Sequence, residues 1–257
     1  MKISDDVLRV MEQLSFDGAL CFINSGQLDA KLYKKLDKVL QACGGKWNRG
    51  KRAHVFADEA EPVVTSALIS GEVRTHKEDG FFETPVSLAR ELASDLGIDT
   101  SSRVLEPSAG RGALVRAALD RGAAKVFAVE WDHVRRKFLE GLSPRVSVSP
   151  GQDFMDLTLL MEPSFSHVIM NPPFYKVGKG NHLDHVLRAF SMLLIGGRLG
   201  AVLPASVIYR TDSRHQQFRD WALKNGGTFV ELPDGTFKSS GTMVRTVKLL
   251  MNRRLSL

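Results

Sequence analysis

The spacing of apolar residues predicts two regions of different architecture. In the first region, apolar residues at positions 28, 32, 36, 39, 40 and 43 recur at helical spacing, so we expect a helix over 28–43 that ends at Gly44-Gly45. The other elements expected here are a helix from a cap at Ser4 to about Leu14, a strand over 19–24, a hairpin over 47–56 turning at Arg49-Gly50, and a helix over 59–69. Together they predict a small α+β domain.

The second region alternates strand patterns with helical patterns up to about Leu223. We expect it to open with Thr84 as the cap of a helix that begins at Pro85. Regular alternation of this kind predicts a parallel sheet covered by helices on both faces. Because the stretch 70–80 is polar and contains turn residues, it is expected to be the linker, which gives domains over residues 1–76 and 77–257.

Composition and charge narrow the class of protein. The 257 residues are 43% hydrophobic and 25% charged, as in ordinary globular proteins. The sequence has no long apolar span and no basic-then-apolar start, so we expect a cytoplasmic protein without a membrane partner. The cysteines Cys21 and Cys43 lack metal-site spacing, and His182 and His185 have no Cys or Glu partner pattern, so no metal is expected.

Positive charge is concentrated between residues 31 and 54. This stretch holds eight lysines and arginines against one acid, whereas the whole chain has a formal net charge of +6. Tyr33, Trp47 and Phe56 lie among these cations, a pattern that favours nucleic-acid contact over an ordinary solvated helix face. The candidate contacts are Lys34, Lys35, Arg49 and Arg52, and the alternative surface would lie around Lys176, Lys179, Arg210 and Arg214.

The most specific chemical signal is the segment from Val168 to Phe174, which reads Val-Ile-Met-Asn-Pro-Pro-Phe. The side-chain carbonyl of Asn171 and the backbone carbonyl of Pro172 can accept both hydrogens of one exocyclic amino group. Two such bonds would localise the nitrogen lone pair, and Phe174 would stack on the base after the base has been flipped out of a duplex. The competing interpretation is a strand that simply ends at a Pro-Pro turn.

A glycine-bearing turn lies upstream of this motif. Residues 103–112 read Arg-Val-Leu-Glu-Pro-Ser-Ala-Gly-Arg-Gly, a strand followed by a turn in which the backbone can approach a ligand closely. The stretch lacks the Gly-Lys-Ser/Thr of a P-loop, so phosphate binding is not expected. A second apolar run ends at Glu130, where α/β folds place a carboxylate that binds a ribose diol, and Asp153 follows a third run.

Over about residues 80–251 these motifs resemble those of S-adenosylmethionine-dependent DNA adenine-N6 methyltransferases. The resemblance implies a Rossmann-like class I methyltransferase fold, a mixed seven-stranded sheet with helices on both faces, and S-adenosylmethionine as cofactor. It implies a catalytic motif made of Asn171, Pro172, Pro173 and Phe174. It implies donor contacts from Phe82, Thr84, Pro85, Glu106, Pro107, Ser108, Ala109, Gly110, Gly112, Glu130, Trp131, Asp153, Phe154 and Asn171. Contacts with the target base are assigned to Phe174, Tyr175, Lys176 and Phe237, where Phe237 is a second aromatic wall within a final hairpin over 237–251.

Two departures from the family affect the expected substrate. Glu106 stands where many members carry Asp, and this difference keeps a carboxylate at that position. Only six residues follow Met251, so no carboxyl-terminal target-recognition domain is expected. We therefore expect low or short sequence specificity on DNA, as in solitary enzymes of phages and plasmids that shield DNA from restriction. The alternatives are methylation of RNA adenine or of a protein glutamine amide, and a non-catalytic nucleic-acid-binding module.

Overall fold

The computed structural model describes residues 1–57, 59–73, 82–157, 164–174 and 180–254. The chain forms two compact units, residues 1–79 and 80–257. In the described ranges, no helix combines the length and the apolar character needed to cross a membrane.

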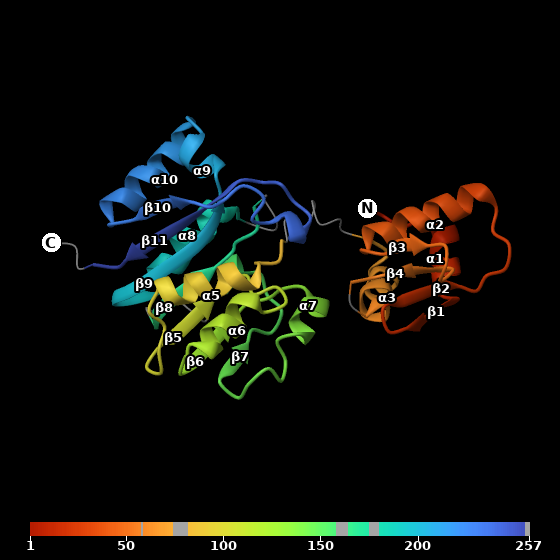
Figure 1. Ribbon diagram of the computed structural model, residues 1–257, viewed down its shortest axis with the longest axis horizontal. Coiled ribbons are helices and arrows are strands. Elements are labelled where there is room, and N and C mark those ends of the chain that lie inside the picture. The colour runs from red at the N-terminus through yellow and green to blue at the C-terminus, as the bar shows by residue number, and fades with distance from the viewer. Residues whose placement is uncertain (58, 74–81, 158–163, 175–179, 255–257) are drawn as a thin grey trace. The chain divides into compact units, whose positions relative to one another are not determined.

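The first unit is built on a four-stranded antiparallel sheet in the order β1-β2-β4-β3 (Figure 1, red and orange). Its elements are α1 (Asp5–Met11), β1 (Leu14–Asp17), β2 (Leu20–Ile23), α2 (Ala30–Ala42), β3 (Lys46–Asn48), β4 (Ala53–Val55) and α3 (Ala60–Ser70). Leu36 and Leu40 of α2 are fully buried in a core that also contains Val7 of α1 and Val64 of α3. The apolar stripe predicted for this helix is therefore its buried face.

The start of the first unit differs from the sequence prediction. The helix expected to reach Leu14 ends at Met11, and Leu14–Asp17 is a strand that pairs with β2. Leu14 and Phe16 are half-buried and alternate with exposed neighbours, a period of two that competes with the helical spacing of the preceding apolar residues. Ser4 occupies the N-cap position, but its side chain makes no cap bond and contacts the carboxylate of Asp6 instead.

The second unit contains a seven-stranded mixed sheet in the order β10-β11-β9-β8-β5-β6-β7 (Figure 1). Its strands are β5 (Arg103–Glu106), β6 (Lys125–Ala128), β7 (Val146–Val148), β8 (Phe165–Met170), β9 (Leu193–Pro204), β10 (Thr228–Glu231) and β11 (Thr246–Asn252). Its helices are α5 (Val86–Asp95), α6 (Ala113–Asp120), α7 (His133–Lys137), α8 (His182–Ser191), α9 (Ser206–Tyr209) and α10 (Ser213–Lys224), with 3-10 turns η1 (Phe154–Asp156) and η3 (Lys238–Ser240).

Neighbouring strands from β9 to β7 are parallel, and β11 is antiparallel to both of its neighbours. The final antiparallel pair is thus β10 with β11, and its first strand begins at Thr228, before the segment 237–251 that the sequence assigned to a hairpin. The mixed sheet itself confirms the predicted fold class.

Helices cover both faces of this sheet, as the alternation of patterns predicts. Successive residues of one strand enter two separate cores, so that Val104 packs with α5 and α6 while Leu105 packs with α8 and α10. On β9, helix α5 comes so close that a Cβ added to Gly200 would lie 2.8 Å from Leu92 Cδ1. Burial on both faces explains why the parallel strands are almost continuously apolar.

The strand order reverses between β5 and β8. The chain leaves β5 toward β6 and β7 and then returns to the other side of β5 as β8. Open α/β sheets bind ligands outside the carboxyl ends of the strands at such a reversal. Glu106 ends β5 and Asn171 follows β8, so the fold brings these two predicted site residues to the same edge of the sheet.

Candidate active site

The side chain of Asn171 is fixed by the segment that precedes α5. Its Nδ2 donates to the carbonyl oxygen of Phe82 at 2.9 Å and to Oγ1 of Thr84 at 3.0 Å. Both amide hydrogens are thereby used. The Oδ1 atom is buried and accepts no hydrogen bond from the part of the chain that the structure describes. Asn171 therefore presents a fixed acceptor oxygen at the carboxyl end of β8.

Thr84 has a different local role from the one predicted. Helix α5 begins at Val86, and Pro85 occupies its N-cap position without a side-chain cap bond. Thr84 lies one residue too early to cap the helix, and its buried hydroxyl accepts from Asn171 instead. The cap prediction is wrong, whereas the predicted contacts of Phe82, Thr84 and Pro85 with a donor remain predictions.

The turn after β5 contacts the motif after β8. The hydroxyl of Ser108 donates to the backbone carbonyl of Asn171 at 3.4 Å. Pro172 is buried and Pro173 is half-buried, and none of the residues described donates to the Pro172 carbonyl. The Pro172 carbonyl is therefore a second acceptor that the described residues leave without a donor.

Three phenylalanine rings pack together next to this motif. The ring of Phe174 lies 5.5 Å from that of Phe82 and 5.8 Å from that of Phe237, measured between centroids. Phe174 is 6% exposed and Phe237 is fully buried. A base between two rings needs about 7 Å, twice the carbon contact distance, so Phe174 and Phe237 must separate before a base can lie between them. Their assignment as two walls around a base stays a prediction.

Glu106 carries a buried oxygen without a partner. Its Oε1 accepts from the backbone N–H of Ser108 at 3.0 Å, whereas its Oε2 accepts nothing from the described residues. Burial raises the pKa of Glu106 well above its usual value, and the nearby charge of Glu130 raises it further, against the effect of the Ser108 N–H. A cation placed beside Oε2 would favour the ionised form.

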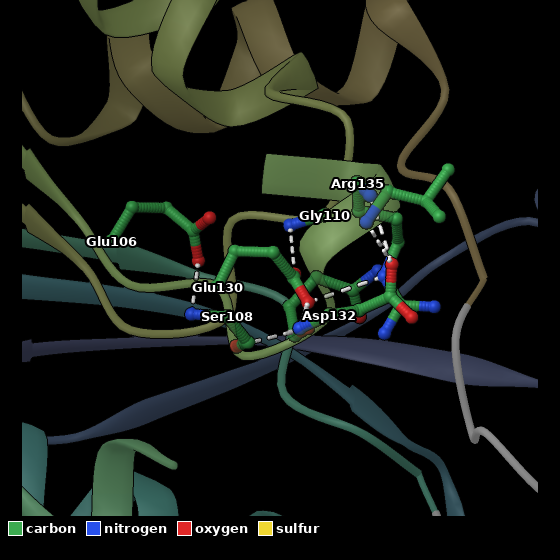
Figure 2. A network of polar contacts seen from close by, with 8 residues as sticks. Glu106, Ser108, Gly110, Glu130, Asp132 and Arg135 are labelled. Carbon is green, nitrogen blue, oxygen red and sulfur yellow. Dashed lines mark hydrogen bonds and ion pairs between the residues drawn. The ribbon is translucent and has the colours of Figure 1, made fainter. Parts of the chain in front are cut away.

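Glu130 holds the glycine-bearing turn and a buried arginine (Figure 2). Its Oε2 accepts from the N–H of Gly110 at 2.8 Å, and its Oε1 accepts from the N–H of Asp132 at 2.9 Å and from Nε of Arg135 at 3.2 Å. Burial raises the pKa of Glu130, and the charge of Arg135 opposes this rise. A ribose bound to Glu130 would therefore have to hydrogen-bond to a carboxylate that already accepts from Gly110, Asp132 and Arg135.

Arg135 did not emerge from the sequence as a site residue. It is 9% exposed, and its guanidinium lies 5.7 Å from the centre of the Trp131 ring, which is 37% exposed. Asp132 caps the short helix α7 through the N–H groups of Val134 and Arg135. That cap, an Asp three residues before an arginine and two residues after Glu130, is the signal that could have indicated the pair.

Two glycines give the turn its shape. Gly110 and Gly112 have φ values of 53° and 89°, in the left-handed region that favours glycine. A Cβ on Gly112 would also lie 2.8 Å from Leu139 Cδ2. At Gly112 the need for glycine comes from backbone shape and packing, in addition to the close ligand approach predicted from the sequence.

A pocket opens at this edge of the sheet. Its cavity volume is about 20 Å³, within a wider hollow that is partly open to solvent. It is lined by Phe82, Glu83, Thr84, Glu106, Ser108, Ala109, Arg111, Ala113, Leu114 and Asn171. Glu106 and Asn171 thus contribute to one pocket.

The remaining predicted donor contacts lie in different environments. Pro107 and Ala109 are buried in the turn. Asp153 caps η1 by accepting from the N–H of Met155 at 2.9 Å. Phe154 is 2% exposed and belongs to the core that also contains residues of α8, so its contact with a donor stays a prediction. Tyr175, Lys176 and Lys179 lie outside the described residues.

The predicted nucleic-acid contacts differ in whether they are already ion-paired. In the first unit, Lys34, Arg49 and Arg52 are exposed, whereas Nζ of Lys35 lies 2.7 Å from Oδ2 of Asp6. On the alternative surface both described arginines are paired, Arg210 with Asp212 at 2.8 Å and Arg214 with Asp184 at 2.5 Å.

The histidines at helical spacing are core residues of α8. His182 and His185 are 7% and 5% exposed, and burial lowers the pKa of His182 to about 4. Within the described ranges, no group of three or more His, Cys, Asp or Glu side chains is arranged to hold a metal ion.

No known protein-family model matches the chain. Over 190 residues, or 63% of the chain, it is 25% identical to the type II restriction enzyme and methyltransferase RM.BcgI of Heyndrickxia coagulans. The match spans 30% of that protein, so the chain covers less than a third of the curated relative's length.

Solved structures with similar folds are methyltransferases and a modification subunit. The chain is similar to a modification subunit of a putative type I restriction enzyme from Vibrio vulnificus (TM-score 0.54, 16% identity, 87% of this chain and 52% of that chain). It is also similar to a putative class I S-adenosylmethionine-dependent methyltransferase from Listeria monocytogenes (TM-score 0.53, 16% identity, covering 88% of this chain and 74% of that chain). A third similar structure is an S-adenosylmethionine-dependent O-methyltransferase from Thermotoga maritima (TM-score 0.50, 15% identity, covering 72% of this chain and 73% of that chain). The second unit therefore has the Rossmann-like class I methyltransferase fold.

Proposed function

We propose that this chain transfers a methyl group from S-adenosylmethionine to the N6 amino group of adenine in DNA. The observation that carries the proposal is the fixed side chain of Asn171, whose Nδ2 is held by Phe82 and Thr84 while Oδ1 has no partner in the described structure. The similarity to RM.BcgI, which is a restriction enzyme and methyltransferase, supports DNA as the substrate class.

The pocket residues fit S-adenosylmethionine, which carries an ammonium group and a sulfonium centre. A buried carboxylate oxygen without a partner is costly, and Oε2 of Glu106 is such an atom. A cationic ligand in the pocket would satisfy it. When bound, S-adenosylmethionine supplies an electrophilic methyl group. Trp131, Asp153 and the second lone pair of Glu130 Oε2 are the groups we assign to its adenosine part.

The residues of the chain would act on the target amino group. Its two hydrogens would be accepted by Oδ1 of Asn171 and by the carbonyl of Pro172, which localises the nitrogen lone pair. No general base is needed before the attack. The positive charge that develops on nitrogen meets acceptors that are already fixed, so little reorganisation is required. Phe174 would support the base by stacking once it has separated from Phe237.

The test is incubation with methyl-labelled S-adenosylmethionine and separate DNA, RNA and protein substrates, followed by hydrolysis and mass spectrometry. We expect the label to appear in N6-methyldeoxyadenosine when DNA is the substrate. Label in RNA adenine alone or in protein glutamine alone would replace the proposed substrate. Absence of label in all three, with intact donor binding, would favour a binding module.

We expect Thr84→Val to lower kcat about five- to tenfold while the KM for DNA changes little. The valine keeps the shape of threonine but removes one of two acceptors that fix the Asn171 amide, a loss of about 1 kcal/mol. Thr84→Ser retains the hydroxyl and is the matched control, for which near-normal turnover is expected. An equal loss of kcat in both variants would mean that packing at position 84, and not the hydrogen bond to Asn171, determines turnover.

Donor binding is expected to weaken as the pH falls. In the free protein, burial and Glu130 favour the protonated form of Glu106, whose pKa is raised, whereas a bound cation favours the carboxylate and lowers that pKa. Between these two pKa values binding releases a proton, so affinity should rise by up to about tenfold per pH unit and become constant above the higher value. Calorimetry in buffers of different ionisation enthalpy would measure the released proton. Glu106→Gln should bind more weakly and abolish the release; unchanged release in that variant would assign the proton to another group.

A further inference from the structure

We propose that the first unit binds single-stranded DNA, with bases stacking on Trp47 and phosphates contacting the cations of α2 and of the turn between β3 and β4. This binding does not depend on the proposed methyl transfer. It requires neither a donor molecule nor a target adenine.

Trp47 is an exposed aromatic ring in a fixed position. It is 43% exposed and lies on β3, the edge strand of the four-stranded sheet, whose three side chains are all exposed. Its ring packs edge-on against Tyr33 at 6.4 Å and against His54 at 5.2 Å, between centroids. Because neighbours hold part of the indole, stacking a base on the exposed part would cost little side-chain entropy.

His54, which packs against Trp47, is held in place by a hydrogen bond. His54 is fully buried opposite Trp47 in the β3–β4 register, and its Nε2 lies 2.8 Å from Oδ1 of Asp37 on α2. The other carboxylate oxygen of Asp37 accepts from the side chain of Gln41 at 2.7 Å. Asp37, the one acid between residues 31 and 54, is therefore bonded to His54 and Gln41 and forms no ion pair with the neighbouring lysines and arginines that the structure describes.

Exposed cations flank this ring on both elements. None of the following has an ion pair with any described residue: Lys34, Lys38, Lys46, Arg49, Lys51 and Arg52. The turn that carries three of them is shaped by Oδ1 of Asn48, which accepts from the N–H of Lys51 at 3.0 Å. The paired arginines Arg210 and Arg214 of the second unit contrast with this group.

Helical geometry separates two adjacent lysines of α2. Lys34 lies about 100° around the helix from Tyr33, which contacts Trp47, so it is nearer to the side that carries this ring than Lys35 is. Lys35 lies a further 100° around the helix and is paired with Asp6 of α1. Lys34 and Lys35 therefore form a natural pair of test and control positions.

The exposed indole favours a single strand over a duplex. In a duplex the faces of the bases are covered by their stacked neighbours, so only phosphates would be available to this surface and Trp47 would contribute nothing. In a single strand every base offers a free face, and an exposed aromatic ring beside a row of cations is the arrangement that binds it. Trp47 thus distinguishes the two kinds of partner.

The test is fluorescence anisotropy of the full chain with three labelled oligomers: oligo-dT, a DNA duplex of the same length, and oligo-U. We expect oligo-dT to bind most tightly. Trp47→Ala should weaken binding of oligo-dT at least about fivefold and binding of the duplex less than twofold, because one stacked base is lost. Trp47→Phe keeps an aromatic face and should retain most of the affinity, which excludes misfolding as the cause.

Charge is tested with Lys34→Gln and Lys35→Gln, which remove the same charge at adjacent positions. Lys34→Gln should flatten the plot of log affinity against log salt by about 0.7 on oligo-dT, and Lys35→Gln should leave the slope unchanged. The proposal is overturned if folded Trp47→Ala binds oligo-dT normally, if the duplex binds more tightly than oligo-dT, or if oligo-U does. Donor affinity, measured by calorimetry, should be the same in all four variants, so this result stands apart from the proposed methyl transfer.

Discussion

Asn171→Ala is expected to abolish nearly all methyl transfer, with kcat reduced by a factor of about 10²–10³. The substitution removes the fixed acceptor that we propose to face the reacting amino group, and the loss of one preorganised group of this kind commonly has this cost. Donor affinity should stay within about threefold, because Oδ1 is proposed to contact the target base and not the donor. Single-turnover assays with labelled donor measure the first quantity, and calorimetry measures the second.

Asn225→Ala is a matched control in the same unit. Its Nδ2 donates to the carbonyl of Trp221 at the end of α10, and Asn225 is not among the residues that line the pocket. We expect this variant to keep normal turnover. Near-normal turnover in Asn171→Ala would remove Asn171 from the mechanism, whatever the control shows.

Glu130→Ala is expected to weaken donor binding at least tenfold and to lower the free energy of unfolding by about 3–5 kcal/mol. The first effect follows from the loss of a charge-assisted hydrogen bond to the ribose, worth about 1.5–3 kcal/mol. The second follows because the ion pair between Glu130 and Arg135 is buried, and removing one partner of a buried ion pair has this cost. Calorimetry and urea denaturation measure the two quantities separately.

A double-mutant cycle separates the two roles of Glu130. Arg135→Ala in the Glu130→Ala background completes the cycle, and the difference between the double loss of stability and the sum of the two single losses measures the coupling between Glu130 and Arg135. Donor affinity should not recover, because the ribose contact is still absent. If donor affinity is unchanged in a folded Glu130→Ala variant, the carboxylate only holds the turn through Gly110 and Asp132.

The site residues that could be predicted are those whose chemistry and position are both local in sequence. Glu106 and Asn171 each follow an apolar run, and parallel strands place such residues at one edge of the sheet. A sheet covered by helices on both faces could be predicted from the alternating strand and helix patterns, whereas its seven strands and mixed direction were implied by the resemblance to methyltransferases. For Asn171 the sequence also indicated which atom is offered, an amide oxygen.

The features that could not be predicted depend on contacts between distant residues. The bond between Asn171 and Thr84 joins positions 87 residues apart, and a threonine before a proline has the local pattern of a cap. Asp6 lies 29 residues from Lys35, so nothing near that lysine in sequence shows that it is paired. Phe174 has the pattern of an exposed stacking residue, but tertiary packing against Phe82 and Phe237 covers it.

The two hydrogen bonds that hold the Asn171 amide also affect how the reaction rate should vary with temperature. A free asparagine side chain must give up rotational freedom to align with a transition state, whereas both torsions of Asn171 are already restricted by Phe82 and Thr84. The entropy of activation for the transfer step should therefore be close to zero. Loosening the amide with Thr84→Val should make this entropy of activation more negative. The Eyring plot of the variant should therefore lie below that of the unmodified chain, with a smaller change in slope than in intercept.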